Sequence, residues 1–415
     1  MSPRPTLAFV NQHYWPDVAS TGQHLTDLAE YLAAEGFDVT VVCSRGRYRG
    51  GALRAPRREV RRGVRIVRLP ATGFGRAREM GRLADYLSFM LAVLAWMGTR
   101  RRFDLAVFLT TPSLIGTVGA ALRMLRGQRF VVWSMDLHPE IEEALGILPP
   151  GPARAFRAVA AAADRRAEFV VALGECMRRR LVERGHRESA LRTIPVWSRG
   201  EDATASPRSV DRLARTLGLE GQYVVMYSGN AGRAHRFDEV LEAMDRLGGD
   251  PGYRFLFVGG GPRKAEILDR AGGLPNFRYL DYRPRSWLAA WLSLADVHLV
   301  TMRGDVEGLV VPGKLYGIMA AGRPAVLIGP RGSSTARTIE SEGIGVVIDP
   351  ADGPGATDRL VVTLEGLRRD PEERERMGRR ARQVFLEKYE RAIACAEWTR
   401  LLRGALGVDG TRAKE

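Results

Sequence analysis

Cysteine is scarce in this chain, and long apolar segments are missing. The three cysteines, Cys43, Cys176 and Cys395, lie far apart in the sequence and show neither CxxC nor metal-ligand spacing. This pattern argues against a disulfide framework and favours a reducing, cytoplasmic compartment. The longest nearly apolar run, Leu87–Met97, is too short to span a bilayer, and the N-terminus has no signal-peptide architecture.

Two motifs that bind phosphates or metals are also missing. The sequence has neither a GxGxxG fingerprint after its first strand nor a Walker A loop, and no Asp-x-Asp occurs. Asp305-Val-Glu307 comes nearest, but a single such pair does not make a Mg²⁺ site. We therefore predict no metal and no other cofactor. If a diphosphate leaves, lysine, arginine and helix dipoles must stabilise it.

Lysine is rare as well, since only four of the 63 basic residues are lysines: Lys264, Lys314, Lys388 and Lys414. Lys314 belongs to Glu307–Pro324, EGLVVPGKLYGIMAAGRP, around which the chain is organised. This stretch separates Asp296–Val300 from Ala325–Ile328, two apolar runs typical of buried parallel strands, and Lys314 opens a short helix between them. A helix start at the carboxyl edge of a parallel sheet is an anion site, to which Lys314 adds a charge suited to phosphate; an ordinary βα loop is the alternative.

The net charge of +15 is unevenly distributed. Ser44–Arg68 carries ten arginines against the single acid Glu59. Such a run is either a solvated loop or a patch for phosphates or an anionic membrane face. Leu87–Met97, with arginines on both sides, is either a buried helix or a helix lying on a membrane surface. Because Tyr48 is the only aromatic residue in the arginine run, we predict no nucleic-acid partner.

Apolar strands alternate with helical patterns in both halves of the chain, which predicts an α/β fold with two Rossmann-like parallel sheets. A length of 415 residues fits two domains. We predict a first domain at 1–199, a polar linker at 200–209, a second domain at 210–388 and a helical tail at 389–415. The strands are predicted at Leu7–Val10, Val39–Cys43, Val64–Leu69, Leu105–Leu109, Phe130–Trp133, Phe169–Leu173, Val224–Tyr227, Phe255–Val258, Phe277–Leu280, Val297–Val300, Ala325–Ile328 and Val346–Ile348.

Ligands of such sheets bind beyond the carboxyl ends of the strands, so we predict a site in the cleft between the domains. The loop Asn11–Gly22 ends at a helix start, where Gly22 lets the backbone approach a diphosphate. Ser228–Arg236, SGNAGRAHR, combines glycines and cations between a strand and a helix, as a phosphate-binding loop needs. Trp133–Glu140, WSMDLHPE, places three titratable groups at a strand end; they are either catalytic or a helix cap.

Six segments together resemble one family. TGQHLTDLAEYLAAEGFDVTVV, DLHPE…ALGIL, YSGNAGRAHRFDEVLEA, FLFVGGGPRK, LADVHLVTM and VPGKLYGIMAAGRP are similar to a branch of the family 4 glycosyltransferases. These are retaining enzymes of GT-B fold, close to those that assemble bacterial exopolysaccharide (colanic-acid type) and O-antigen units. The resemblance covers nearly the whole chain, in order.

The resemblance implies a nucleotide-sugar donor, for which we expect a UDP-sugar, in the C-terminal domain. It also implies an acceptor sugar on the N-terminal domain, a polyprenyl-diphosphate-linked acceptor being one form, and no metal requirement. The C-terminal helix is expected to cross back to the first domain. Members of the family commonly dock on the inner membrane face, so a cytoplasmic, peripheral location is expected.

The chain departs from the family at its two donor-site glutamates, which are eight residues apart. The second position is Gly317 and the first falls at Leu309, with Glu307 as a substitute. The usual diphosphate-binding Arg and Lys fall near Asn230 and His235. The predicted catalytic residues are Asp136, His138, Lys314 and Arg233. The predicted donor-binding residues are Gly22, Gly229, Asn230, His235, Arg236, Gly260, Tyr282, Glu307, Val311, Pro312, Gly313, Leu315 and Tyr316. The predicted acceptor-binding residues are His13, Tyr14, Trp15 and Glu140.

Two other functions stay open from the sequence. A nucleotide-sugar epimerase of the same fold would need acidic bases at the site. A non-catalytic protein that binds anionic surfaces would use the arginines of Ser44–Arg68.

Overall fold

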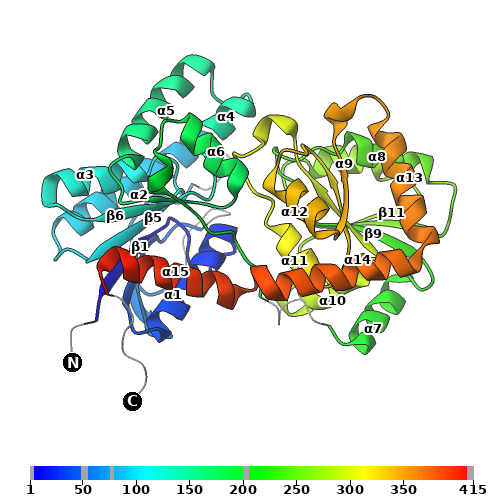
Figure 1. The fold of residues 1–415 in the computed structure, drawn as a ribbon, viewed down its shortest axis with the longest axis horizontal. Helices are drawn as coiled ribbons and strands as arrows, with labels where there is room; N and C mark the ends of the chain where they lie inside the picture. Colours follow the sequence, from blue (N-terminus) through cyan, green and yellow to red (C-terminus); the bar gives the residue numbers. More distant parts are fainter. Residues whose placement is uncertain (1–3, 48–54, 75–78, 200–204, 409–415) are drawn as a thin grey trace. The chain divides into compact units, whose positions relative to one another are not determined.

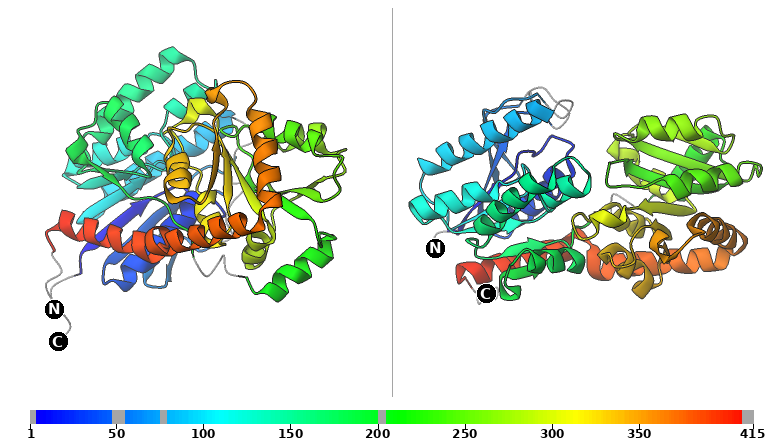
Figure 2. Two further views of the ribbon diagram at one scale, coloured as in Figure 1. Left: turned by 45° about the vertical axis from the view of Figure 1, so that its right-hand side comes forward. Right: turned by 90° about the horizontal axis from the view of Figure 1, so that it is seen from above.

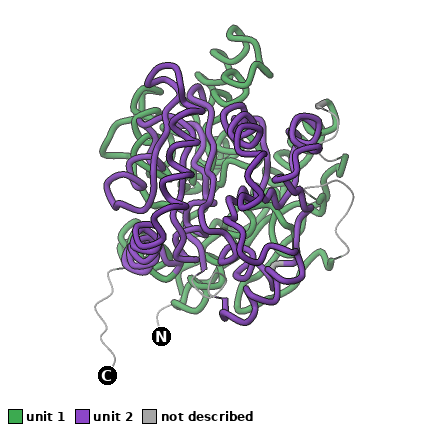
Figure 3. The backbone as a smooth tube through the Cα atoms, turned by 90° about the vertical axis from the view of Figure 1, so that its right-hand side faces the viewer, with its two compact units in different colours: residues 1–195, 392–415 green, residues 196–391 purple. Residues whose placement is uncertain are grey.

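The chain forms two compact units in the structure, a computed structural model that describes residues 4–47, 55–74, 79–199 and 205–408. Unit 1 contains residues 1–195 and 392–415, and unit 2 contains residues 196–391 (Figure 3). Each has its own sheet with helices on both faces (Figures 1 and 2). Residues 200–204 of the predicted linker lie outside the described residues.

The sheet of unit 1 has eight strands in the order β3-β4-β2-β1-β5-β6-β7-β8. Every neighbouring pair is parallel except β3 with β4. The central strands are wholly buried apolar runs, as a sheet covered on both faces requires. The strands are β1 (Thr6–Val10), β2 (Asp38–Ser44), β3 (Arg58–Arg61), β4 (Val64–Leu69), β5 (Leu105–Leu109), β6 (Phe130–Trp133), β7 (Val170–Ala172) and β8 (Leu191–Thr193).

The helices of unit 1 lie against this sheet with their apolar faces. In α1, Leu25, Leu28 and Leu32 are fully buried at the spacing of one helix face. The C-terminal α15 also belongs to this unit, where Trp398 packs on Trp133 of β6 with ring centroids 4.8 Å apart. The helices are α1 (Ser20–Ala34), α2 (Glu79–Gly98), α3 (Gly116–Arg126), α4 (Glu140–Ala144), α5 (Pro150–Asp164), α6 (Glu175–Glu183) and α15 (Arg391–Leu406).

The sheet of unit 2 has six parallel strands in the order β11-β10-β9-β12-β13-β14. Aromatic residues fill much of its core, with Phe237, Phe255 and Phe257 essentially inaccessible. The strands are β9 (Tyr223–Asn230), β10 (Tyr253–Gly260), β11 (Phe277–Leu280), β12 (Val297–Thr301), β13 (Ala325–Ile328) and β14 (Gly345–Ile348). The helices are α7 (Pro207–Leu217), α8 (Asp238–Arg246), α9 (Lys264–Ala271), α10 (Leu288–Leu294), α11 (Lys314–Ala320), α12 (Ser334–Glu342), α13 (Ala356–Arg369) and α14 (Pro371–Val384).

The predicted interruption of the C-terminal helix near Tyr389 is confirmed. A π-helical turn, Phe385–Tyr389, separates α14 from α15, and Glu390 has extended backbone. All twelve predicted strands are present with ends shifted by up to three residues, but β3 and β8 were missed. These two strands are short and carry arginine, so they lack the apolar run that identifies a strand in sequence.

The arginine run Ser44–Arg68 is only partly a solvated loop, which corrects the first interpretation. Arg68 is fully buried; it donates hydrogen bonds to the carbonyl groups of Pro56 and Trp15 and pairs with Glu59. Arg61 and Arg62 both pair with Glu30 of α1. Several guanidinium groups therefore join the edge of the sheet to the body of unit 1. Arg49 and Arg54 lie outside the described residues.

The helix α2 is longer than the apolar run that predicted it. Its segment Met80–Gly98 has the length and composition of a membrane span, and only 22% of that window is buried in unit 1. One face, with Phe89 and Val93, is fully buried. The apolar run Leu87–Met97 therefore underestimates the length of the helix. α2 has one packed face and one exposed face.

Candidate active site

In unit 2, glycines bring the ends of β9 and β10 close together. Gly229 and Gly259 both have positive φ, and a side chain at Gly259 would collide with the Gly229 carbonyl group. The loop after β9 is bonded to its neighbours on both sides, since Ala231 N–H donates to Gly260 O (2.6 Å) and Arg303 N–H donates to Ala234 O (2.9 Å). The predicted phosphate-binding loop is thus held at the carboxyl edge of the sheet, where open α/β sheets bind ligands.

Lys314 brings its charge to the same edge from the start of α11. Its Nζ is buried, has no hydrogen-bond partner among the described residues and lies 3.5 Å from the centroid of the Tyr227 ring. A Cβ at Gly229 would lie 4.0 Å from this nitrogen. Burial lowers the pKa of Lys314 well below its usual value. Because a buried ammonium is costly without a counter-charge, this position is suited to an anionic ligand.

His235 is held beside Lys314 as a neutral imidazole. Its Nδ1 lies 2.5 Å from Thr301 O at the end of β12, which identifies Nδ1 as the protonated donor. Burial and the charge of Lys314 lower the pKa of His235 to about 3. His235 therefore offers a hydrogen bond rather than a charge, and Lys314 is the cation at this point.

The two predicted arginines of the loop differ from Lys314. Arg236 is paired with Glu239 of α8 through two hydrogen bonds, one of them 2.9 Å long, so its charge is already compensated. Arg233 is exposed, and its guanidinium makes no hydrogen bond or ion pair with another described residue. Of the three cations predicted from the sequence, Lys314 alone is both buried and unpaired.

Residues from 307 to 317 divide between the sheet edge and the core. Leu315 and Tyr316 are buried, and the Tyr316 ring packs on Tyr389 with centroids 5.0 Å apart. Val311 is half-buried and Pro312 is buried. Gly313, the residue before α11, is exposed. The carboxylate of Glu307 lies against the Gly332 backbone, where any side chain at position 332 would collide with it.

Two further predicted donor-site residues meet at the end of β10. The half-exposed ring of Tyr282 lies over Gly260, where a Cβ would approach its Cε2 to 2.8 Å. Asn230 is paired with Gly260 in the β9–β10 register, and its carbonyl group accepts a hydrogen bond from the Tyr227 hydroxyl (2.9 Å). This arrangement leaves a half-exposed aromatic ring at the rim of the sheet edge, and an aromatic ring is a group on which a base can stack.

In unit 1, the predicted acceptor loops lie on one edge of the sheet. They follow the neighbouring parallel strands β1, β5 and β6, whose carboxyl ends share that edge. Gln12 N–H donates to Thr111 O (2.8 Å), and the N–H groups of Met135 and Asp136 donate to Thr110 Oγ1 (2.9 and 3.2 Å). Asp136 and the Asn11 loop are therefore both connected to the loop after β5.

His138 has a carboxylate partner that the sequence did not indicate. Its Nδ1 lies 2.8 and 2.9 Å from the two carboxylate oxygens of Glu142, one helical turn away on α4. Burial opposes a charge on the imidazole, but the hydrogen bond and charge of Glu142 outweigh burial and raise the pKa of His138. Within the described ranges of the chain, the other ring nitrogen, Nε2, makes no hydrogen bond. His138 can thus act as a hydrogen-bond donor toward a substrate oxygen.

Glu140, predicted to bind the acceptor, is instead used within unit 1. It accepts hydrogen bonds from Arg184, one of them 2.8 Å long, and pairs with Arg157. Arg184 also donates to His138 O and lies 3.6 Å from Asp164, whose pKa burial raises to about 6. This network fixes the backbone of the His138 loop, so Glu140 acts through Arg184 on the position of His138.

The remaining predicted residues of unit 1 lie in the loop after β1. His13 pairs with Asp17 (3.0 Å), and Tyr14 is buried. Trp15 is partly exposed, with the Arg61 guanidinium 4.5 Å from its ring centroid. Gly22 is in the first turn of α1, where a Cβ would come within 2.9 Å of His13 O. Gly22 therefore allows α1 to pack closely on this loop.

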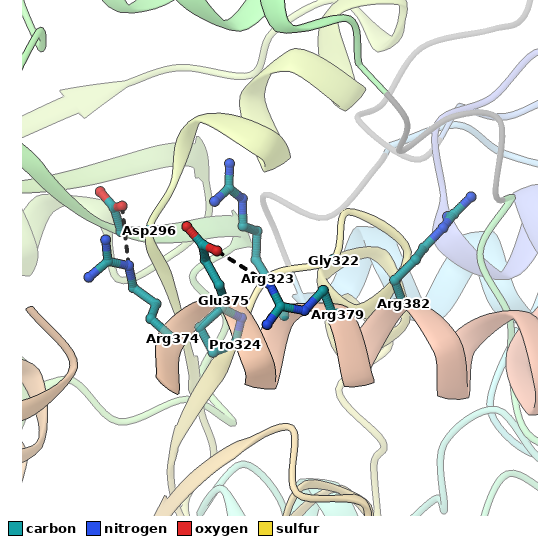
Figure 4. Close-up of a pocket in the computed structure, with 9 residues that line it drawn as sticks. Asp296, Gly322, Arg323, Pro324, Arg374, Glu375, Arg379 and Arg382 are labelled. Carbon is teal, nitrogen blue, oxygen red and sulfur yellow. Dashed lines mark hydrogen bonds and ion pairs between the residues drawn. The ribbon is translucent and has the colours of Figure 1, made fainter. Parts of the chain in front are cut away.

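Two hollows lie away from these loops. In unit 2, a hollow of about 410 Å³ lies between the segment Gly322–Pro324 and α14 (Figure 4). Its arginines serve the protein itself: Arg374 pairs with Asp296 (3.5 Å), and Arg382 donates to Ala320 O (2.6 Å). In unit 1, a hollow of about 1090 Å³ is lined by Arg58, Arg65, Arg100, Arg101, Arg102 and other residues. Neither hollow contains a predicted site residue.

Four residues of these sites were missed from the sequence: Tyr227, Arg263, Glu142 and Arg184. Arg263 donates to His235 O (2.5 Å) and so stabilises the loop after β9. Glu142 could have been found, because it follows His138 by only four residues in the sequence. In the sequence, Tyr227 looks like an ordinary strand residue, and its neighbours do not indicate a role in ligand binding. Among the described residues, no three His, Cys, Asp or Glu side chains are grouped as metal ligands.

Family models and known proteins agree with this organisation. Residues 21–197 match the glycosyl transferase 4-like domain, and residues 222–365 match glycosyl transferases group 1. WcaI of Escherichia coli (strain K12), named as a colanic acid biosynthesis glycosyl transferase, is 26% identical over 354 residues, covering 81% of this chain and 87% of WcaI. WbjE of Pseudomonas aeruginosa, named as a probable glycosyltransferase, is 25% identical, covering 82% of this chain and 84% of WbjE.

Solved structures share the fold at low sequence identity. Sucrose-phosphate synthase from Thermosynechococcus elongatus is similar with a TM-score of 0.78 and 17% identity, covering 98% of this chain and all of that protein. HepE of Anabaena, solved with UDP-glucose, is similar with a TM-score of 0.73 and 15% identity, covering 96% of this chain and 99% of HepE. These matches favour neither an epimerase nor a non-catalytic protein. The chain belongs to the family 4 glycosyltransferases of GT-B fold, and it is a glycosyltransferase.

Proposed function

We propose that the chain transfers a sugar from a UDP-sugar, with retention of configuration and without a metal, to a hydroxyl group of an acceptor in cell-surface polysaccharide assembly. The observation that carries the proposal is the buried, unpaired ammonium of Lys314 beside the glycine turns of β9 and β10. The groups around the Lys314 ammonium do not neutralise it, so a bound diphosphate is its natural counter-charge. HepE, solved with UDP and with UDP-glucose, supports the nucleotide, and the name of WcaI supports the pathway class.

In this mechanism Lys314 stabilises the charge that grows on the leaving diphosphate. The acceptor hydroxyl attacks from the face that the diphosphate leaves, and the diphosphate takes its proton. Asp136 and His138 orient the sugar and the acceptor. Tyr282 provides the stacking surface for the base.

A panel of UDP-, GDP- and TDP-sugars with mass analysis of the product tests this function. We expect one UDP-sugar to yield a glycosylated acceptor and UDP to raise the melting temperature, while oligonucleotides leave it unchanged. Interconversion of a nucleotide sugar without acceptor would instead identify an epimerase. Stabilisation by oligonucleotides alone would identify a non-catalytic anion-binding protein.

The proposal includes an acceptor that is linked to a lipid, reached by docking of unit 1 on the inner membrane face. Its support is the outer face of α2, where the side chains of Met80, Leu83, Leu87 and Leu91 are 77%, 49%, 51% and 66% exposed. Spacings of three and four residues place them in one stripe. Arg100–Arg102 follow at the helix end, and basic residues contribute about 1 kcal/mol each near an anionic surface.

Co-sedimentation with vesicles tests the docking. Binding to vesicles with anionic lipid should exceed binding to neutral vesicles and weaken with salt, because the Debye length is about 8 Å at physiological ionic strength. The double substitution Leu87→Glu and Leu91→Glu should abolish it. Val362→Glu is the control, since Val362 on α13 of unit 2 is 67% exposed, close to the 66% of Leu91. Equal binding by the double variant and the control would exclude α2 as the docking surface.

A further inference from the structure

The ammonium of Lys314 is surrounded by groups that cannot neutralise it. Its Nζ is buried against the face of the Tyr227 ring, 3.5 Å from the centroid, and has no hydrogen-bond partner in the part of the chain that the structure describes. The phenol is uncharged, because burial raises the pKa of Tyr227. A desolvated cation–π contact contributes about 2 kcal/mol, less than the several kcal/mol that burial of an ion costs.

Charged groups on the neighbouring elements do not compensate either. On the loop after β9, His235 is neutral and Arg236 is paired with Glu239 of α8. On the turn after β10, Arg263 is paired with Glu266 of α9. On β12, burial lowers the pKa of His298 to about 4 and keeps it neutral. The carboxylates of Glu239 and Glu266 are thus already paired with arginines.

We propose that binding of the donor diphosphate is coupled to the uptake of one proton by Lys314. This inference rests on the proposed function, because it takes the Lys314 site as the diphosphate site. In the free enzyme, burial shifts the side chain toward the neutral amine, and in the complex it is the ammonium paired with a phosphate oxygen. The balance is simple: one N–H bond forms, the proton comes from the solvent, and no bond of the nucleotide breaks.

The sign of the linkage follows from burial. Burial lowers the pKa of Lys314 in the free enzyme, and a bound diphosphate raises it again because the opposite charge favours the ammonium. Between these two pKa values binding takes up a proton, so the affinity should fall about tenfold for each pH unit. Above neutral pH the diphosphate is itself fully ionised, since its last phosphate pKa is about 6, and it contributes little to the proton balance.

Titration calorimetry with UDP, run on the full chain at one mildly alkaline pH in buffers of different ionisation enthalpy, measures this uptake. The slope of the apparent enthalpy against the buffer enthalpy gives the protons bound per UDP. We expect a value approaching one for the wild type and near zero for Lys314→Arg, because a guanidinium stays charged in both states. Lys388→Arg is the matched control, since Lys388 is paired with Glu342, and it should keep the wild-type uptake.

The outcomes separate this inference from the proposed function. UDP binding without proton uptake by the wild type overturns the coupling and leaves the donor site intact. An unchanged uptake in Lys314→Arg also overturns it, because another group then takes the proton. No UDP binding by the wild type overturns the proposed function as well. If Lys314→Arg does not fold, the dissociation constant of the wild type over pH decides, and a flat profile above neutral pH refutes the coupling.

Discussion

His138 and Glu142 form an ion pair on unit 1 in which one ring nitrogen meets both carboxylate oxygens, at 2.8 and 2.9 Å. The pair fixes the imidazole with Nδ1 directed at Glu142, which leaves Nε2 as the nitrogen available to a substrate. His138 follows β6 on the loop whose Met135 and Asp136 N–H groups donate to the Thr110 hydroxyl, and Glu142 lies on α4. His138, which was predicted from the sequence, is thus oriented by Glu142, which was not predicted.

Replacing Glu142 by glutamine should lower the free energy of unfolding by about 1–2 kcal/mol at mildly acidic pH, the order of a hydrogen bond between charged groups. The raised pKa of His138 contributes stability below its unfolded value of about 6.5, lost as pH rises through the folded value. The pKa of Glu142 is lowered: burial opposes this, and His138 outweighs it. Its contribution is lost as pH falls through the folded value.

Chemical denaturation over a pH series measures this effect. The difference between wild type and Glu142→Gln should be largest from about pH 4.5 to 6.5, where both groups are charged, and should shrink on either side. Glu183→Gln is a matched control, because Glu183 is paired with Arg180 at the surface. Its replacement should change the free energy of unfolding by only a few tenths of a kcal/mol. A difference that does not change with pH would refute the ion pair.

Lys314→Met should separate activity from stability. The loss of one preorganised positive charge should lower kcat/KM by about 10²–10³. The stability should rise by about 1 kcal/mol or more near neutral pH, because methionine fills the space without a buried amine. The lowered pKa of Lys314 means that the folded protein binds fewer protons, so this gain should vanish as pH rises past about 10.4.

The control for this variant is Lys388→Met, at a half-exposed lysine paired with Glu342. It should leave kcat/KM unchanged and alter stability by less than about 0.5 kcal/mol. Steady-state kinetics and denaturant unfolding provide both quantities. A destabilised, fully active Lys314→Met protein would remove Lys314 from the donor site.

Gly317→Glu should strengthen donor binding. A Cβ at Gly317 would meet only Leu292 Cδ1, at 3.5 Å, so the helix has room for a side chain there. The helix itself gains about 0.5–1 kcal/mol when glycine is replaced. If the ribose lies at this position, a carboxylate should improve the dissociation constant of UDP about tenfold. Gly317→Ala controls for the helix effect, and equal affinities of the two variants would place the ribose elsewhere.

Asp136→Asn and His138→Ala should slow transfer by about 10²-fold or more while leaving the affinity for the nucleotide sugar nearly unchanged. Both side chains belong to unit 1, whereas the predicted diphosphate site is in unit 2. Calorimetry of donor binding beside turnover measurements distinguishes the two effects. Affinity lost in step with rate would assign both residues to the donor site, and unaltered turnover would reduce the DLHPE segment to a helix cap.

Removal of divalent ions should leave activity unchanged. The prediction rests on the missing Asp-x-Asp motif and on the cationic character of the Lys314 site. Turnover with EDTA, compared with turnover in added Mg²⁺, measures it. Loss with EDTA that Mg²⁺ restores would require a metal site around Asp305 and Glu307.

The sequence by itself determined most of the strands, the glycine turns and the family. Apolar runs such as Leu105–Leu109 can only be buried, and glycines such as Gly259 mark places where backbones meet, so both are readable locally. The short lysine-led helix α11 was also predictable, because Gly322 and Pro324 stop it. The antiparallel β3 was not, since its residues, Arg58–Arg61, lack an apolar pattern and it depends on pairing with β4.

Tertiary structure alone decided which charges are available. Arg236 and Lys314 look equivalent as phosphate ligands in sequence, yet Arg236 is paired with Glu239, and Lys314 is buried on Tyr227, 87 residues earlier in the chain. Likewise Arg68 is enclosed, and its two terminal nitrogens are bonded to Glu59 and two carbonyl groups. Hydrophobic burial follows from side-chain type, but the pairing of a charge depends on which distant residues the fold brings within a few ångströms of it.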